Sequence, residues 1–350
     1  MKTAIVFIQI GNPIPVYALE NIKRTTGLFA QENFFLVVDE KVFKTVPAEL
    51  KILANLTIFV SDLEWSSISP NVGPKDFRQG FWQYTKLRLC TLRELHLEYP
   101  QFSLLHVEND VLLLPDFLNF SFDSIELTSW LSHTVQDDSG AILFTPSSAS
   151  TDTFVERFMA EIENEGMNSD MRILNRMRKT FPSDFGLLPT LNSSILGPNE
   201  DLSSEHPIDE VSGFDPAFLG IWMFGDDARN RFGLSKRFTI LGKGKAILPE
   251  LLDFDSNENS LFFNKSKQKN KVLSVHVHSK KTEVFSALWA SEIEKAILVS
   301  RRGRPTWNFS FKIFVEVLAD YKRRGKLHTL VIALPVIGKL IAKLKSSVSS

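Results

Sequence analysis

Three short apolar runs, separated by helical or polar stretches, restrict the fold of this sequence more than any other feature. They cover residues 4–10, 34–38 and 56–60, and each ends at a polar or turn-forming residue. Apolar runs of this length are typical of strands that are buried on both faces of a parallel sheet. Because a helical pattern over residues 16–29 separates the first two runs, the sequence predicts an α/β domain with a mostly parallel sheet and helices on its faces.

Polar side chains follow these runs, at the edge of the sheet where such proteins bind ligands. Gln9, Asp39 and Asp62 all lie near strand ends. A strong helix is expected over residues 81–98, and Arg88 falls within its apolar stripe. A charge on a buried face needs a partner. Two interpretations are open: Arg88 pairs with a structural carboxylate, or its guanidinium reaches a bound phosphate.

Glu108-Asn109-Asp110 stands between two aliphatic runs, residues 102–107 and 111–114. Two carboxylates cannot stay ionised inside a sheet without partners, so they lie at a strand end, bind a divalent cation, or have a structural role. Side chains two positions apart in an extended segment point the same way. One hard cation with diphosphate oxygens would satisfy both charges and stabilise a leaving nucleoside diphosphate.

Several segments resemble bacterial-type GT-A glycosyltransferases, and they come in the same order. Residues 81–89 and 105–114 resemble the helix and strand around the Asp-x-Asp motif of that family, and the opening runs resemble its first strands. Residues 214–230 are similar to its acceptor-side segment, and residues 274–280 to its closing strand. The resemblance implies a GT-A (Rossmann-like) fold: a mixed, mostly parallel sheet flanked by helices.

The resemblance also implies the residues that bind metal and donor. Asp110 and Glu108 would hold Mn²⁺ or Mg²⁺, and His276 or His278 of the closing strand would complete the shell. We prefer His276, and a pair of core histidines is the alternative. The residues expected to bind the nucleotide-sugar donor are Gln9, Asp39, Lys86, Arg88, Glu108 and Asn109.

One position departs from the family motif, because Glu108 stands where the family has aspartate. Its longer side chain can reach a ribose or a metal-bound water instead of the ion, so we expect Asp110 to be the main metal ligand. An enzyme that inverts the sugar configuration also needs a base. The candidates are Asp170, Asp215, Asp226 and Asp227, although a structural role is the favoured interpretation of each.

Other classes of protein lack their motifs here. There is no Gly-x-x-x-x-Gly-Lys-Ser/Thr loop and no Gly-x-Gly-x-x-Gly after the first run. The single cysteine, Cys90, excludes a Cys-x-x-Cys zinc site and an intramolecular disulfide. Two alternatives to a glycosyltransferase stay open. One is a non-catalytic, membrane-associated scaffold of the same fold, and the other is a sugar nucleotidyltransferase, although residues 11–15 lack the glycine- and arginine-rich loop usual in that class.

The charge of −1 hides an asymmetry between two regions, which we expect to be a catalytic domain of residues 1–300 and a tail of residues 301–350. The tail has eleven Lys/Arg and two acidic residues, a net charge of +9, which leaves −10 on the rest. We expect an amphipathic helical tail that lies on an anionic membrane surface, or else packs on the body. An acidic body argues against nucleic acid as a partner.

The remaining expectations concern location, acceptor and the second half of the chain. No secretory signal is recognisable, so we expect a cytoplasmic protein whose tail contacts the inner face of a membrane. The acceptor is a glycan, a lipid-linked molecule or a protein. Helices are expected over residues 154–163 and 171–180, an exposed lysine-rich loop over residues 256–271, and a strand over residues 271–278.

Overall fold

The computed structural model describes most of the first 301 residues. Asp226, Asp227 and the tail beyond residue 301 lie outside the described residues, so the expectations about them stay predictions. The described ranges are residues 2–63, 81–132, 138–165, 169–191, 212–224, 252–265 and 268–301.

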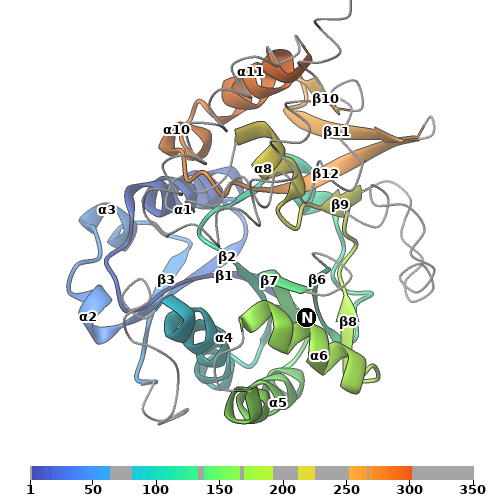
Figure 1. The fold of residues 1–350 in the computed structure, drawn as a ribbon. Coiled ribbons are helices and arrows are strands. Elements are labelled where there is room, and N and C mark those ends of the chain that lie inside the picture. The colour runs from blue at the N-terminus through green and yellow to red at the C-terminus, as the bar shows by residue number, and fades with distance from the viewer. Residues whose placement is uncertain are drawn as a thin grey trace, which may run out of the picture.

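A seven-stranded sheet forms the centre of the molecule, in the order β3-β2-β1-β4-β7-β6-β8 (Figure 1). β1 to β4 are parallel to one another, β6 is parallel to β8, and β7 runs antiparallel to both of its neighbours. The mixed, mostly parallel sheet expected from the sequence is therefore confirmed. The strands are β1 (Lys2–Gln9), β2 (Asn33–Asp39), β3 (Leu56–Ser61), β4 (Phe102–Val107), β6 (Thr128–Ser132), β7 (Asp138–Thr145) and β8 (Phe185–Leu187).

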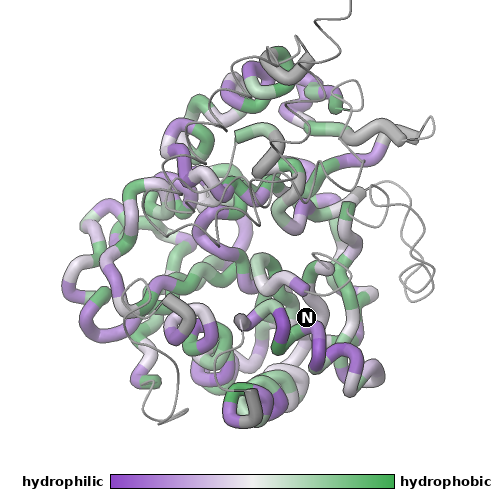
Figure 2. Tube along the Cα trace, in the orientation of Figure 1, coloured by the Kyte–Doolittle hydropathy of each residue, from purple (hydrophilic) through white to green (hydrophobic). Residues whose placement is uncertain are grey.

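Helices cover both faces of this sheet, and Figure 2 shows that its central strands are largely hydrophobic. Along β1, Ala4 and Val6 pack under one set of helices, whereas Ile5 and Phe7 pack under the other. The first set is α4 (Phe81–Glu98), α5 (Ser148–Glu165) and α6 (Asp170–Thr180). The second set is α1 (Val16–Leu28), α2 (Glu40–Phe43), α3 (Ala48–Lys51) and the 3-10 helix η3 (Pro115–Asn119).

A second, smaller sheet lies beside the first, with the order β10-β11-β12-β5, and β9 pairs with β12 (Figure 1). Its antiparallel pairing of β12 with β5 sets His276 opposite Val111. The strands are β5 (Val111–Leu113), β9 (Ser212–Phe214), β10 (Leu252–Asp255), β11 (Ser260–Lys265) and β12 (Gln268–His276), and α8 (Phe218–Phe224), α10 (Thr282–Phe285) and α11 (Trp289–Arg301) pack against them.

One expectation about this sheet was wrong. Residues 256–271, expected to be an exposed loop, include β11 and the start of β12. The polar and lysine-rich composition of this segment does not reveal the hairpin. Its Leu261 is buried against the helices of the small sheet, and Phe262, on the opposite face of the strand, is buried as well. None of the helices in the described part of the chain has both the length and the hydropathy of a membrane span.

Candidate metal centre

The Glu108-Asn109-Asp110 turn lies where the large sheet meets the small one, between the end of β4 and the start of β5. Backbone bonds fix the turn, because Glu108 N–H donates to Ala141 O at 2.8 Å and Val111 N–H donates to Glu108 O at 2.9 Å. Fully buried Asn21 of α1 adds two more bonds, to Asn109 O at 3.1 Å and Val111 O at 2.8 Å. The carboxylates on either side of Asn109 are therefore carried by a rigid turn.

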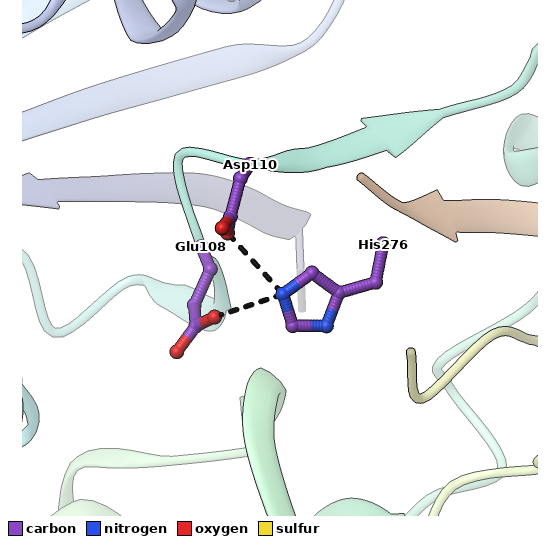
Figure 3. Close-up of side chains that lie close together, drawn as sticks. All are labelled: Glu108, Asp110 and His276. Carbon is purple, nitrogen blue, oxygen red and sulfur yellow. Dashed lines mark ion pairs between the residues drawn. The ribbon is translucent and has the colours of Figure 1, made fainter. Parts of the chain in front are cut away.

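His276 approaches this turn from β12, so that three side chains converge at one point (Figure 3). Its Nε2 atom lies 3.3 Å from Glu108 Oε2 and 3.3 Å from Asp110 Oδ1. Ligands at about 2.1 Å from an octahedral ion lie about 3 Å apart when adjacent, so the spacing fits a divalent cation with small adjustments. We refer to Glu108, Asp110 and His276 as the acid–histidine cluster.

Each carboxylate of the acid–histidine cluster uses its other oxygen for a cation of the protein. Arg88 Nη2 bonds to Glu108 Oε1, and Lys280 Nζ donates to Asp110 Oδ2 at 2.7 Å. One oxygen of each carboxylate is thus held from outside, while the second faces the imidazole. Such outer contacts fix the orientation of metal ligands in other sites.

The protonation of the acid–histidine cluster follows from burial and from these charges. Burial alone would raise the pKa of Glu108 and of Asp110. Arg88 lowers the pKa of Glu108, and Lys280 lowers that of Asp110, so that both values lie below their ordinary range. For His276, burial lowers the pKa, but the two carboxylates outweigh it and raise the pKa to about 10. When no metal ion is bound, a protonated His276 adds to Arg88 and Lys280 in stabilising the pair of carboxylates.

Of the two interpretations of Arg88, the structure contains the pairing with carboxylates. The guanidinium bonds to Glu108 and lies 3.3 Å from Asp170 Oδ2. Asp170, a candidate base, also accepts the N–H of Met171, and burial raises its pKa. Lys86 is fully buried on the same helix as Arg88, and burial lowers its pKa. Arg88, Asp170 and Lys86 thus add further buried charged groups on the side of the acid–histidine cluster that holds Glu108.

The other residues expected to bind the donor lie at the same sheet edge and bond within the protein. Asn109 Nδ2 donates to Gln9 Oε1 at 2.8 Å. Asp39 caps α2 by accepting the N–H of Val42, and its second oxygen accepts the N–H of Gly11. The positions agree with a ligand site beyond the strand ends, although these particular side-chain atoms already have partners.

The prediction that Asp215 acts as a base is not supported by its surroundings. Its carboxylate is 1% exposed and accepts four backbone N–H groups, which leaves it no access to an acceptor hydroxyl. His278 lies beside the cluster: its ring stacks on His276 with centroids 4.2 Å apart, and it is not among the three converging residues. Of the two histidines, His276 is therefore the one whose geometry fits a ligand.

Two residues of the site were missed in the sequence. Lys280 lies four positions after His276, within the segment that resembles the closing strand, and only the fold shows that its ammonium group contacts Asp110. Asn21 follows Ala18 and precedes Ile22 and Thr25 on the buried face of α1. A polar residue on such a face needs partners, and that signal could have marked Asn21 for attention.

No protein-family model and no curated protein sequence matches this chain. Similar solved structures include the galactosyltransferase LgtC in complex with donor and acceptor sugar analogues, at 12% identity over 53% of this chain and 73% of LgtC, with a TM-score of 0.36. The PaToxG glycosyltransferase is 12% identical over 52% of this chain and 70% of that chain, with a TM-score of 0.35.

A third similar structure is the apo form of the glycosyltransferase GlyE from Streptococcus pneumoniae TIGR4. It is 13% identical over 55% of this chain and 48% of GlyE, with a TM-score of 0.36, so the match spans about half of GlyE. These three proteins are glycosyltransferases, the class that the sequence resembles. Because TM-scores below 0.5 do not assign a function, the function of this chain is inferred from the acid–histidine cluster itself.

Proposed function

We propose that this chain is a metal-dependent glycosyltransferase, which moves a sugar from a nucleotide-sugar donor to an acceptor. The observation that carries the proposal is the convergence of Glu108, Asp110 and His276 within 3.3 Å contacts, although more than 160 positions separate the turn from the histidine. The resemblance of the surrounding segments to GT-A enzymes supplies the donor class. The proposed metal ligands are the three residues of the acid–histidine cluster.

The reaction breaks the bond between the sugar anomeric carbon and the diphosphate oxygen, and the diphosphate keeps the electron pair. The acceptor oxygen bonds to the anomeric carbon, and its proton passes to a carboxylate base or to the released diphosphate. Bound Mn²⁺ or Mg²⁺ would supply Lewis-acid stabilisation of the leaving diphosphate. Arg88 and Lys280 hold the carboxylates in position through their outer oxygens, and burial of the cluster strengthens each of these interactions.

The test is hydrolysis or transfer from a panel of nucleoside-diphosphate sugars by the full chain, with Mn²⁺ and with EDTA. We expect release of nucleoside diphosphate that depends on the metal and is lost in Asp110→Asn, which keeps the shape of the side chain but removes its charge. Metal-independent turnover, or equal turnover by Asp110→Asn, would contradict the proposed metal role. The absence of both Mn²⁺ binding and turnover would favour the non-catalytic scaffold instead.

A second proposal concerns the tail, residues 301–350, whose net charge of +9 supports contact with an anionic membrane. We propose that residues 301–350 hold the enzyme at such a surface, near a lipid-linked or envelope-bound acceptor. The experiment is co-sedimentation with anionic liposomes at low and high salt, comparing the full chain with a version in which the tail lysines and arginines are replaced by glutamine. Salt-sensitive pelleting of the full chain alone is expected, and equal pelleting of both proteins would contradict the idea.

A further inference from the structure

The short segment of residues 215–220 touches His276 at both its backbone and its ring. The carboxylate of Asp215 accepts from Ala217 N–H at 3.1 Å and Leu219 N–H at 3.0 Å through Oδ1. Through Oδ2 it accepts from Gly220 N–H at 2.9 Å and His276 N–H at 3.1 Å. One buried carboxylate thus ties the segment, the start of α8 and the end of β12 together.

The ring of His276 is also held by this segment, because its Nδ1 atom lies 3.4 Å from Pro216 O. A carbonyl oxygen only accepts hydrogen bonds, so the proton of a neutral imidazole belongs on Nδ1. Nε2 is then left with its lone pair, and it is the nitrogen that faces Glu108 and Asp110. The contact with Pro216 therefore favours the tautomer that a metal ligand needs.

The same segment lies close to the His276 backbone at Gly220. A Cβ atom built on Gly220 would lie 1.8 Å from His276 O, so only glycine fits at this position. Ala217 has a φ of 149°, a conformation that L-residues rarely adopt. Strain of this kind persists only where the surroundings enforce it, and here the enforcing contact is the bond from Ala217 N–H to Asp215.

We propose that residues 215–220 form a clamp that positions His276 for metal binding, with Asp215 as its positioning residue. The inference rests on the proposed metal-dependent function. It replaces the predicted role of Asp215 as a base, because both of its oxygens are occupied by backbone N–H groups. The carboxylate acts on the metal only through His276, whose backbone it fixes and whose ring orientation follows from the position of Pro216.

The test is binding of Mn²⁺ alone to the full chain, followed by EPR of free and bound ion and by the ¹⁴N modulation that a coordinated imidazole produces in the pulsed EPR spectrum. His276→Ala gives the reference without imidazole. Asp215→Asn turns one acceptor oxygen into a donor, and we expect Mn²⁺ affinity to fall by about 10- to 100-fold with a weakened ¹⁴N signal. Ala217→Gly relieves the strain and keeps the bond from the N–H of residue 217 to Asp215, and we expect wild-type affinity.

Two further variants keep the test decisive if Asp215→Asn folds poorly. Gly220→Ala displaces the His276 backbone without changing any charge, and it should weaken both affinity and the ¹⁴N signal. Asp138→Asn is the matched control, because Asp138 is another buried carboxylate with four donor contacts, and none of these donors belongs to the acid–histidine cluster. We expect Asp138→Asn to bind Mn²⁺ as the wild type does.

The outcomes separate this inference from the proposed function. If the wild-type chain binds no Mn²⁺, the proposed function fails. If the wild type binds with a ¹⁴N signal and His276→Ala loses it, but Asp215→Asn and Gly220→Ala match the wild type, the clamp is wrong and the function stands. If Asp138→Asn loses affinity as much as the clamp variants do, the effect is general destabilisation, and the clamp is likewise rejected.

Discussion

Asp138 and the acid–histidine cluster are two buried carboxylate sites of one molecule, and their partners differ. Asp138, at the start of β7, is fully buried and accepts from Trp130 Nε1 at 2.8 Å and Asn175 Nδ2 at 3.0 Å. Arg178 completes the set with bonds of 2.8 and 3.2 Å from its Nε and Nη2 atoms. Each oxygen has two donors, so this group needs no ligand from outside.

The acid–histidine cluster instead brings two carboxylates to face one imidazole. Only one oxygen of Glu108 and one of Asp110 bond to a protein cation, and the others converge on His276. Burial of an acid is thus a poor sign of a binding site, since Asp138 is the more buried of these acids. Convergence of several acids on a single point is the better sign, because like charges are costly to hold together without a cation.

The largest effect on stability is expected at Asp138, whose two oxygens both have protein donors. Asp138→Ala should lower the free energy of unfolding by about 3–5 kcal/mol, because it leaves the Arg178 charge and the Trp130 N–H without their buried acceptor. Urea denaturation followed by fluorescence measures this, and the folded fraction should bind Mn²⁺ normally. If Asp138→Ala lowers the free energy of unfolding by less than about 1 kcal/mol, then Asp138 contributes no more to stability than the acid–histidine cluster does, and the comparison fails.

At the acid–histidine cluster we expect the opposite: a large loss of metal affinity with little change in stability. Asp110→Asn should weaken Mn²⁺ binding by at least about 100-fold, which exceeds the usual effect of changes to outer contacts. The free energy of unfolding should change by no more than about 1 kcal/mol, because the loss of the pairing with Lys280 is offset by relief of repulsion from Glu108. EPR titration and urea denaturation of the same preparation measure both quantities, and strong unfolding with unchanged affinity would reverse the comparison.

The sequence predicted one side of this comparison better than the other. The turn at Glu108-Asn109-Asp110 and the closing strand with His276 were both recognisable, since local pattern marks acids between aliphatic runs and an alternating strand. The Asp138 group was not recognisable, because Trp130 and Arg178 come from separate elements and only the packing of α6 on β7 brings them together. Partners that are distant in sequence leave no periodic signal.

The same reason explains the other successes and failures. Strands β1 to β4 and helix α4 were predicted close to their observed bounds, because apolar runs and helical stripes are local features. Residues 256–271 were misread because a hairpin whose sequence is polar and lysine-rich has the composition of a loop. The role of Asp215 could not be read from its neighbours, since three of its four donors lie within five positions but the fourth is His276.

A third, smaller effect on stability is expected at His96, a buried neutral side chain whose two ring nitrogens both have hydrogen-bond partners. His96 is fully buried between Thr151 Oγ1 at 2.6 Å and Phe102 O at 2.7 Å, and burial lowers its pKa, partly opposed by the bond to Phe102 and by Asp152. Below an unfolded-state pKa of about 6.5, the unfolded chain binds a proton that the folded chain does not, so stability is lost as the pH falls. Between pH 7 and 5 the loss is at most about 2 kcal/mol.

The measurement for His96 is urea denaturation at pH 7 and pH 5. His96→Gln can still donate to Phe102 and accept from Thr151, and it has no titrating group, so the difference between the two pH values should shrink. If the variant and the wild type lose equal stability between pH 7 and pH 5, then the pKa of His96 does not differ between the folded and the unfolded chain. Like Asp138, this residue should affect stability and leave Mn²⁺ affinity unchanged at pH 7.

The smallest effect, on Mn²⁺ affinity, is expected at Glu108. It tests whether the two acids of the acid–histidine cluster are equivalent as metal ligands. Glu108→Gln keeps the length and one acceptor oxygen, and Arg88 keeps Asp170 as a partner, so Mn²⁺ affinity should fall only about tenfold, or about 1.4 kcal/mol. Asp116→Asn is the control, because it neutralises another buried acid, paired with Lys271 of β12, outside the cluster. A fall as large as in Asp110→Asn would show that Glu108 coordinates the ion as fully as Asp110 does. The glutamate that departs from the family motif would then be a full ligand, because Arg88 holds its longer side chain against the ion.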